Sequence, residues 1–188
     1  FCLGDVSGKG VPAALFMSAT VHLFRSVGHQ TEDPSQIVSA INDGLADGND
    51  ENMFCTLFVG VLDLKTGVLN YCNAGHNAPV LISSEGAAFL PVKPNIPTGT
   101  FEGFQFSSET VQFVDNDVLL LYTDGITEAE NQFNEQYGDA ALIDVVSALR
   151  QCDMKELTTL IHSSVNAFVD DAEQSDDITM LAIRWRQS

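Results

Sequence analysis

The middle of the chain consists of short β-rich segments separated by turn residues, and this series limits the fold more than any other feature of the sequence. The segment MFCTLFVGVLDLKTGVLNYCNAG contains two such runs around Lys65-Thr66-Gly67, which is typical of a hairpin turn. Further runs follow, separated by Gly, Pro and Ser: APVLIS, AAFLPV, GFQFSSETVQF and DVLLLYT. Successive short strands of this kind favour mainly antiparallel sheets.

Helical patterns flank the strands. Residues 11 to about 27 predict a first helix that is apolar around most of its surface, so we expect it to be largely buried. Asp33, with Gln36 three residues later, forms a capping box that starts a second helix ending near residue 45. Two more helices are expected near residues 139–151 and 154–169, before a last strand in DITMLAIRW. The pattern predicts a single α+β domain spanning residues 1–188.

The chain carries far more acidic than basic residues. Its 26 Asp and Glu against 8 Lys and Arg give a formal net charge of −18. Such a surface repels phosphate backbones and anionic lipids, so we expect no nucleic-acid partner and no membrane insertion. The ordinary explanation is a well-solvated surface, and the alternative is that some carboxylates converge on a cation. The cysteines are widely spaced, which indicates reduced thiols in a cytoplasmic protein rather than a zinc site or disulfide framework.

The glycine-rich stretch LGDVSGKGVPAALFMSA, residues 3–19, raises the question of a phosphate-binding loop. A Walker A loop has four residues between its first glycine and the Gly-Lys pair, followed by Ser or Thr. Here three residues separate Gly4 from Gly8, and Gly10 stands where the hydroxyl residue would be. The stretch therefore does not predict nucleotide binding, and what remains is Asp5 at the end of an apolar strand.

Acidic residues recur where an apolar strand meets a loop. Asp124 and Gly125 follow the strand VLLLYT, and Asp176 and Asp177 precede the last strand. Taken singly, an Asp-Gly pair is usually a turn and surface aspartates are usually solvated. Together with Asp5 they form a set of carboxylates, which are the ligands that Mg²⁺ and Mn²⁺ prefer. The sequence therefore favours a divalent-cation site at the strand ends.

Four segments in this order resemble a known family: GDVSGKGVPAALFMS, MFCTLFVGVLDLKTGVLNYCNAGHNAPVLI, LLLYTDGITEAEN and DDITMLAIR. The chain is similar to the metal-dependent protein phosphatases (PPM, protein phosphatase 2C-like) of the bacterial SpoIIE/RsbU type, over residues 1–186. The resemblance implies an α-β-β-α sandwich, in which two mainly antiparallel sheets are flanked by helices. It also implies a site for two Mn²⁺ or Mg²⁺ ions.

The resemblance assigns the metal site residue by residue. It implies that Asp5 bridges both ions and that the carbonyl of Val6 is a further ligand. Asp124 and Asp176 complete the catalytic carboxylates, with Asp177 the less favoured choice at the last position. Family members also carry a G-G-D segment on strands before DVSGKG, which this chain lacks. We therefore expect the domain to be truncated at its N-terminus, and whether this fragment is active or inactive by itself stays open.

Other residues near these motifs have weaker assignments. Lys9 is a candidate contact to substrate phosphate, although a lysine in such a turn is more often solvated. His76 is a candidate general acid or a partner of a metal-site water, but ordering of its loop is the favoured interpretation. Gly125 is expected to serve backbone geometry, and Ser7 and Thr123 are candidates for hydrogen bonds that support the metal ligands.

The implied function is hydrolysis of phosphoserine or phosphothreonine in a protein. Metal-activated water can attack phosphorus directly, so no cysteine nucleophile is needed. The resemblance implies a phosphorylated anti-sigma-antagonist-type substrate, bacterial stress or sigma-factor signalling, and an upstream sensor or receiver domain. A non-catalytic phosphatase-like module that binds a partner or senses a metal is the alternative. A Ca²⁺-stabilised domain is disfavoured because the D-x-[DN]-x-[DN]-G loop is absent. Homodimer formation and the choice between Mn²⁺ and Mg²⁺ stay open.

Overall fold

The structure, a computed structural model, describes residues 1–172 and 176–187. The chain divides into two compact units. Unit one comprises Phe1–His76 and Val92–Gln112, and unit two comprises Asn77–Pro91 and the chain from Phe113 onward. In the described part of the chain, no helix combines the length and the apolar character that a membrane crossing requires.

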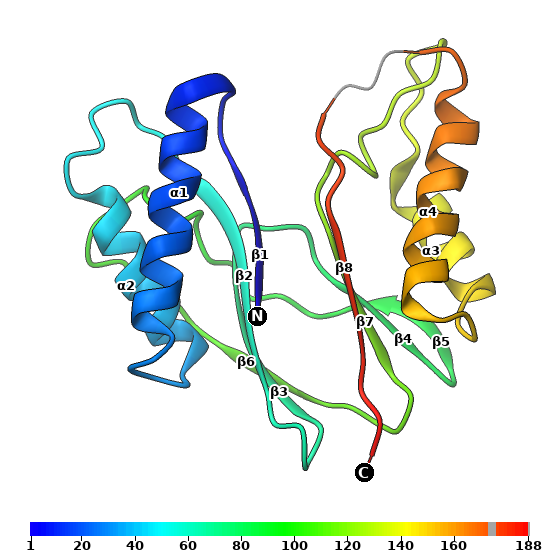
Figure 1. Cartoon of the computed structure of the whole chain (residues 1–188), viewed down its shortest axis with the longest axis horizontal. Helices are drawn as coiled ribbons and strands as arrows, with labels where there is room; N and C mark the ends of the chain where they lie inside the picture. The colour runs from blue at the N-terminus through cyan, green and yellow to red at the C-terminus, as the bar shows by residue number, and fades with distance from the viewer. Residues whose placement is uncertain (173–175, 188) are drawn as a thin grey trace. The chain divides into compact units, whose positions relative to one another are not determined.

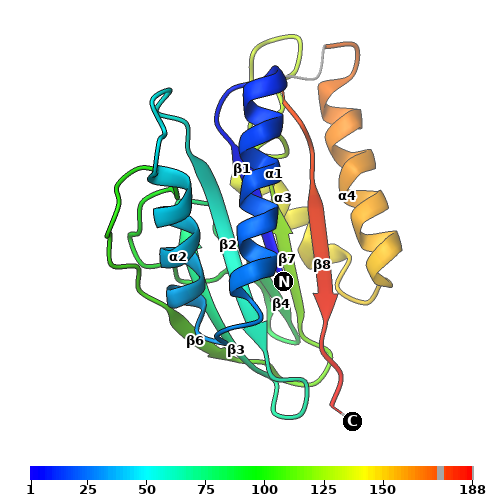
Figure 2. The same ribbon diagram turned by 60° about the vertical axis from the view of Figure 1, so that its left-hand side comes forward.

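Unit one is an antiparallel sheet with two helices packed beside it. The sheet has the order β1-β2-β3-β6, and its strands are β1 (Cys2–Val6), β2 (Cys55–Leu62), β3 (Val68–Ala74) and β6 (Glu109–Gln112). Helices α1 (Gly10–Val27) and α2 (Pro34–Ala46) lie side by side, and α2 contacts both β2 and β3 (Figures 1 and 2). β1 is thus an end strand of this sheet, and α1 follows it directly.

The core of unit one lies between α2 and the sheet. The apolar residues of α2 recur at helical spacing, so they form one buried stripe: Ile37, Val38, Ile41 and Leu45. They pack on side chains of one sheet face, among them Leu57, Val59, Cys72 and Ala74. This burial removes apolar surface from water and is the main favourable contribution to folding of the unit.

The expectation that the first helix is largely buried is wrong. In α1 only Thr20 is buried, while Val11 and Leu15 are 72% and 67% exposed. The helix packs on α2 and on β1, and it covers the core with one stripe that includes Phe16 and Phe24. Because these partners cover a single side of the helix, the apolar residues on its other side stay at the surface.

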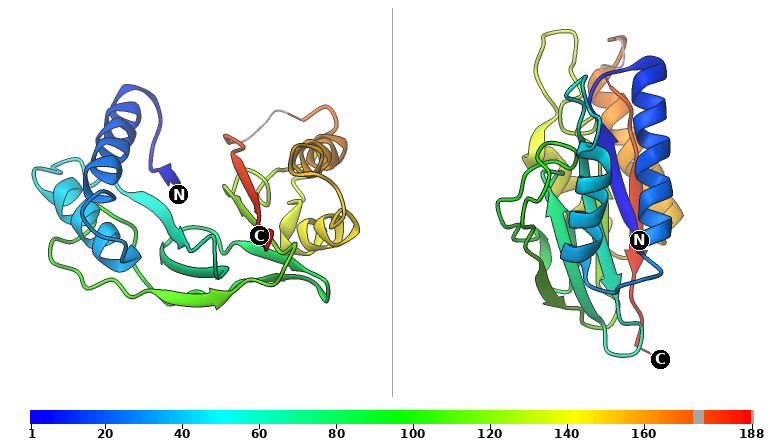
Figure 3. Two further views of the ribbon diagram at one scale, coloured as in Figure 1. Left: turned by 60° about the horizontal axis from the view of Figure 1, so that its bottom comes forward. Right: turned by 90° about the vertical axis from the view of Figure 1, so that its left-hand side faces the viewer.

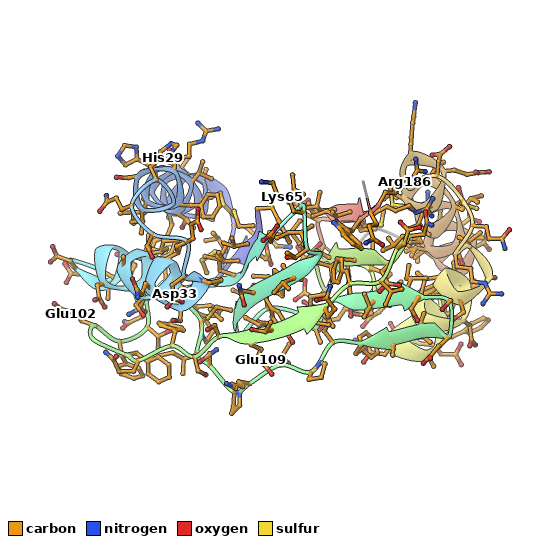
Figure 4. All side chains as sticks on the ribbon, turned by 90° about the horizontal axis from the view of Figure 1, so that it is seen from below. His29, Asp33, Lys65, Glu102, Glu109 and Arg186 are labelled. Carbon is orange, nitrogen blue, oxygen red and sulfur yellow. The ribbon has the colours of Figure 1, made fainter. Side chains whose placement is uncertain are left out.

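Local sequence signals agree with the structure at the hairpin and at the start of α2. The Asp63 carboxylate accepts hydrogen bonds from the backbone of Lys65 and Thr66 at 2.8 and 3.1 Å, which closes the turn between β2 and β3. These bonds lower the pKa of Asp63. Asp33 caps α2 through a bond from Ser35 N; Figure 4 labels Lys65 and Asp33 at these two places.

Unit two is also an antiparallel sheet with two helices. The sheet order is β5-β4-β7-β8, with β4 (Val80–Ser83), β5 (Gly86–Phe89), β7 (Val118–Tyr122) and β8 (Met180–Arg184). Helix α3 (Gly138–Ala148) contacts β4 and β5, and α4 (Met154–Val169) contacts β8 and α3 (Figures 1 and 3). All five residues of β7 are buried, which explains its uninterrupted run of apolar side chains.

The described residues confirm the predicted α+β class, with antiparallel sheets and helices in each unit. Two predicted strands are shorter than their apolar patterns. Only residues 109–112 of GFQFSSETVQF form a strand, because Phe104 and Phe106 pack edge to face and against the core of unit one instead. The last strand is limited to Met180–Arg184, so Asp176 and Asp177 lie in the segment before it.

Candidate metal and catalytic site

Asp5 lies near the end of β1, opposite Thr56 of β2. The Thr56 hydroxyl donates to the Asp5 backbone carbonyl at 3.4 Å. Val6 is the last residue of the strand, and Ser7 continues the pairing because its backbone N–H donates to Phe54 O at 2.9 Å. The Ser7 hydroxyl accepts a hydrogen bond from Phe54 N, so it fixes the end of the strand on which Asp5 and Val6 lie.

His76 is buried in the loop after β3 and is held by two side chains. Asn73 accepts a hydrogen bond from His76 N at 2.7 Å and donates to His76 O at 2.8 Å. Nδ1 of His76 lies 3.0 Å from the Thr56 hydroxyl. These contacts favour the loop-ordering interpretation, because the backbone and Nδ1 of His76 are occupied in fixing the loop next to the partner of Asp5.

Lys9 lies on an exposed turn between β1 and α1. Lys9 is the residue directly before α1, so it is close in sequence both to Asp5 and to the N-terminus of a helix. Anions are stabilised at such helix ends, which is compatible with a role in contacting phosphate.

In unit two, the structure brings together the two acidic segments that the sequence singled out. The Thr123 hydroxyl donates to the backbone carbonyl of Asp177 at 2.9 Å and accepts from Thr179 N at 3.0 Å. At Gly125 a Cβ atom would overlap that same carbonyl oxygen of Asp177 and would lie 3.3 Å from Asp176 O. The segment 123–125 therefore packs directly on the segment 176–179. The bonded residues Thr123 and Asp177 are 54 residues apart along the chain.

The Asp124 carboxylate has one oxygen atom, Oδ1, that is buried without a hydrogen-bond donor in the described part of the chain. Its backbone carbonyl, in contrast, accepts from Glu128 N at 2.7 Å. Asp176 accepts a hydrogen bond from Asp177 N through Oδ1 at 2.9 Å. Because a buried, unpartnered carboxylate oxygen is costly, its position suits a cation, and the carboxylate chemistry of Asp124 and Asp176 fits Mn²⁺ or Mg²⁺.

The predicted ligands are divided between the units. Asp5 and Val6 belong to unit one, and Asp124, Asp176 and Asp177 belong to unit two. Within each unit, the residues that the structure describes contain no group of three or more His, Cys, Asp or Glu side chains arranged to hold a metal ion.

Sequence reasoning missed Thr56 and Asn73 as parts of this region. Asn73 precedes His76 by three residues, a spacing at which an Asn side chain commonly bonds the following backbone, so a local signal was present. Thr56 gave no such signal, because its place opposite Asp5 follows from the register of β1 on β2.

The antiparallel sheets, the paired helices and the aspartates at the strand ends together define one class of protein. Comparison with known proteins identifies that class. Residues 1–186 match the family model described as Stage II sporulation protein E (SpoIIE). The chain belongs to this family, and it is a SpoIIE/RsbU-type phosphatase domain of the PPM class, as the sequence motifs predicted.

Individual relatives agree with this assignment. The chain is 26% identical to phosphoserine phosphatase RsbU of Bacillus subtilis, over 97% of this chain and 54% of RsbU. It matches the crystal structure of the RsbU and RsbW domains of Rv1364c from Mycobacterium tuberculosis with a TM-score of 0.81 and 25% identity, over 98% of this chain and 51% of that one. RsbX in complex with magnesium shares the fold, with a TM-score of 0.67 and 17% identity over 97% of this chain and 79% of RsbX.

The chain spans about a third to a half of the length of the curated relatives that it matches first, 33% and 54%. The activities, substrates and partners of those whole proteins therefore enter only as parts of the proposal that follows.

Proposed function

We propose that this chain is the catalytic domain of a metal-dependent protein phosphatase that hydrolyses phosphoserine or phosphothreonine, and that both units form this one domain. The observation that carries the proposal is the buried Oδ1 of Asp124, without a donor among the described residues, in a segment packed on Asp176 and Asp177. The name of RsbU, a phosphoserine phosphatase, supports the same reaction class.

The proposed metal ligands are Asp5, the Val6 carbonyl, Asp124 and Asp176, with Asp177 as the alternative at the last position. Two Mn²⁺ or Mg²⁺ ions held there would lower the pKa of a water molecule toward neutral pH and would neutralise charge on the phosphate. The magnesium complex of RsbX supports a divalent cation in this fold.

Three further residues have roles in this proposal: Lys9 contacts substrate, and Thr56 and His76 are positioning residues. Lys9, exposed in the turn before α1, would contact the phosphate as a point charge. Thr56 and His76 fix the strand that carries Asp5.

In the overall reaction, water oxygen forms a bond to phosphorus, the bond from phosphorus to the serine or threonine oxygen breaks, and that oxygen gains a proton.

The proposed substrate is a phosphorylated anti-sigma-antagonist-type regulator in the bacterial cytoplasm, and a sensor or receiver domain upstream in the same protein would control the activity. The support is the similarity to phosphoserine phosphatase RsbU and to the structure of Rv1364c, in which an RsbU domain and an RsbW domain share one chain. A homodimer is compatible with this role.

The test is phosphate release from a phosphoserine peptide and from p-nitrophenyl phosphate, with Mn²⁺, with Mg²⁺ and with EDTA. It is made on this chain and on a version extended upstream, each beside its Asp124→Asn variant. The proposal predicts turnover in the extended protein that requires a divalent cation and falls at least a hundredfold in the variant. Absence of turnover from a folded, metal-loaded extended protein would favour a non-catalytic, partner-binding or metal-sensing module.

A further inference from the structure

The Thr123 hydroxyl connects the two acidic segments of unit two. The residue is buried, with 4% of its surface exposed. Its hydroxyl oxygen donates to Asp177 O at 2.9 Å and accepts from Thr179 N at 3.0 Å. A hydroxyl has one hydrogen to donate, so its donor capacity is used entirely by the Asp177 carbonyl.

These bonds lie where the regular pairing of β7 and β8 ends. The last regular pair is Tyr122 with Met180. At the next position the backbone provides the bond from Thr123 N to Thr179 O, at 3.1 Å, and the Thr123 hydroxyl takes the Thr179 N–H. The side chain therefore extends the pairing past the end of the strands, into the segment that carries Asp176 and Asp177.

Gly125, the residue after Asp124, also packs against the backbone carbonyl of Asp177. Gly125 has no side chain, and a Cβ atom there would overlap Asp177 O and lie 3.0 Å from the carbonyl carbon. Thr123 and Gly125 thus both contact the Asp177 carbonyl, and Asp124 is the residue between them. The backbone on both sides of Asp124 is fixed against the segment that begins at Asp176.

We propose that Thr123 is a positioning residue that sets where the Asp124 and Asp176 carboxylates lie relative to each other, and thereby sets the affinity of the site for a divalent cation. The inference rests on the proposed function, since it takes Asp124 and Asp176 as metal ligands. Residues that orient ligands in this way typically change metal affinity about 10–100-fold when they are replaced. A Thr123 that only filled space in the core would leave the affinity unchanged when an isosteric side chain replaced it.

The test compares Thr123→Val, which has the same shape but no hydroxyl, with Thr123→Ser, which keeps the hydroxyl. Thr98→Val is the matched control, because Thr98 is also buried and its hydroxyl donates to Cys55 O at 2.8 Å in unit one. The dissociation constant for Mn²⁺ is measured by isothermal titration calorimetry. Amide hydrogen exchange at Thr179 is measured without metal, because that N–H loses its acceptor in Thr123→Val.

The inference predicts an Mn²⁺ dissociation constant raised at least tenfold in Thr123→Val and within about threefold of wild type in Thr123→Ser and Thr98→Val. Thr179 exchange should accelerate in Thr123→Val alone. If Thr123→Val fails to give a cooperative thermal transition, Thr123→Ala is measured in its place, since it removes the hydroxyl without adding a methyl group.

The outcomes separate the inference from the proposed function. Wild-type protein that binds no Mn²⁺ would contradict the metal assignment and this inference with it. Wild-type protein that binds Mn²⁺, together with a hydroxyl-free variant that binds it equally well, would overturn only the role of Thr123. Loss of affinity in Thr123→Ser, with the hydroxyl retained, would overturn that role as well.

Discussion

The Thr56 hydroxyl lies 3.0 Å from Nδ1 of His76. The same hydroxyl donates to the backbone carbonyl of Asp5 at 3.4 Å. Because a hydroxyl has one hydrogen, a Thr56 that donates to Asp5 must accept the hydrogen of His76 Nδ1. The loop after β3 is therefore linked to the strand of Asp5 through a single side chain, and this link has a measurable energy.

A double-mutant cycle with Thr56→Val and His76→Ala measures that link. We expect the two substitutions to be non-additive in the free energy of unfolding, by about 0.5–1.5 kcal/mol, the usual net value of one hydrogen bond. Urea denaturation gives the four free energies. The control cycle pairs Thr56→Val with His162→Ala, which changes an exposed residue of α4, and it should be additive. Additivity in the first cycle would mean that His76 and Thr56 do not interact.

Gly125→Ala should strongly reduce both the stability of the protein and its affinity for Mn²⁺. The added methyl group would overlap the backbone carbonyl oxygen of Asp177, and a backbone atom cannot rotate away as a side chain does. We expect loss of more than about 2 kcal/mol in the free energy of unfolding, in the range of core overpacking, and at least tenfold weaker Mn²⁺ binding. The control is Gly103→Ala, where φ is +73° but no atom lies within 4 Å, so only backbone strain of about 1–2 kcal/mol is expected. Wild-type Mn²⁺ affinity in Gly125→Ala would contradict the packing described at Gly125.

Ile41→Ala and Leu15→Ala should differ sharply in stability. Ile41 is fully buried in the core of unit one, so its truncation should cost about 2–5 kcal/mol. Leu15 is 67% exposed on α1, so its truncation should change stability by less than about 0.5 kcal/mol. Urea denaturation midpoints of both variants provide the comparison. A cost for Leu15→Ala similar to that for Ile41→Ala would show that this face of α1 is buried in solution.

Asp117 gives a prediction about pH. Burial raises the pKa of its carboxyl group, while a bond from Val114 N at 2.8 Å lowers it to a smaller extent. A raised folded-state pKa means that the folded protein holds the proton more tightly than the unfolded chain. Ionised Asp117 is therefore a destabilising group above its folded-state pKa, and this penalty disappears as the pH falls below the unfolded value of 3.8.

Asp117→Asn removes this penalty. Relative to wild type, the variant should gain stability as the pH rises from about 4 toward 7, and the gain should become constant once Asp117 of the wild type is ionised. The comparison is made by urea denaturation across that pH range. A difference between Asp117→Asn and wild type that shrinks with rising pH would contradict the sign of the shift.

Much of the local structure was predictable because its causes lie within a few residues. The turn at Lys65-Thr66-Gly67 depends on the Asp63 side chain, two and three residues away from its partners. The start of α2 at Asp33 was predictable for the same reason, although Thr31 rather than Gln36 binds the Asp33 N–H. Gln36 instead bonds the Asp33 carboxylate at 3.3 Å.

The burial of α1 was not predictable from its own sequence. An apolar helix is buried only where another element covers it, and the number of covered sides depends on the tertiary arrangement. In the candidate site, the aspartates remain a prediction, made from their positions at strand ends and from the family resemblance. Ser7 and Thr123 were expected to support these aspartates, but the partners of the supporting contacts were not predictable. Thr56 with His76 and Thr123 with Asp177 are 20 and 54 residues apart and depend on strand register.

The most direct test of the account is Mn²⁺ binding by calorimetry to the wild-type chain and to Asp5→Asn, Asp124→Asn, Asp176→Asn and Asp177→Asn. We expect that wild-type protein binds Mn²⁺, that the first three substitutions each weaken binding at least tenfold, and that Asp177→Asn stays within about threefold of wild type. Wild-type affinity in Asp124→Asn would contradict this expectation, because the buried carboxylate oxygen of Asp124 would then have no part in holding a cation.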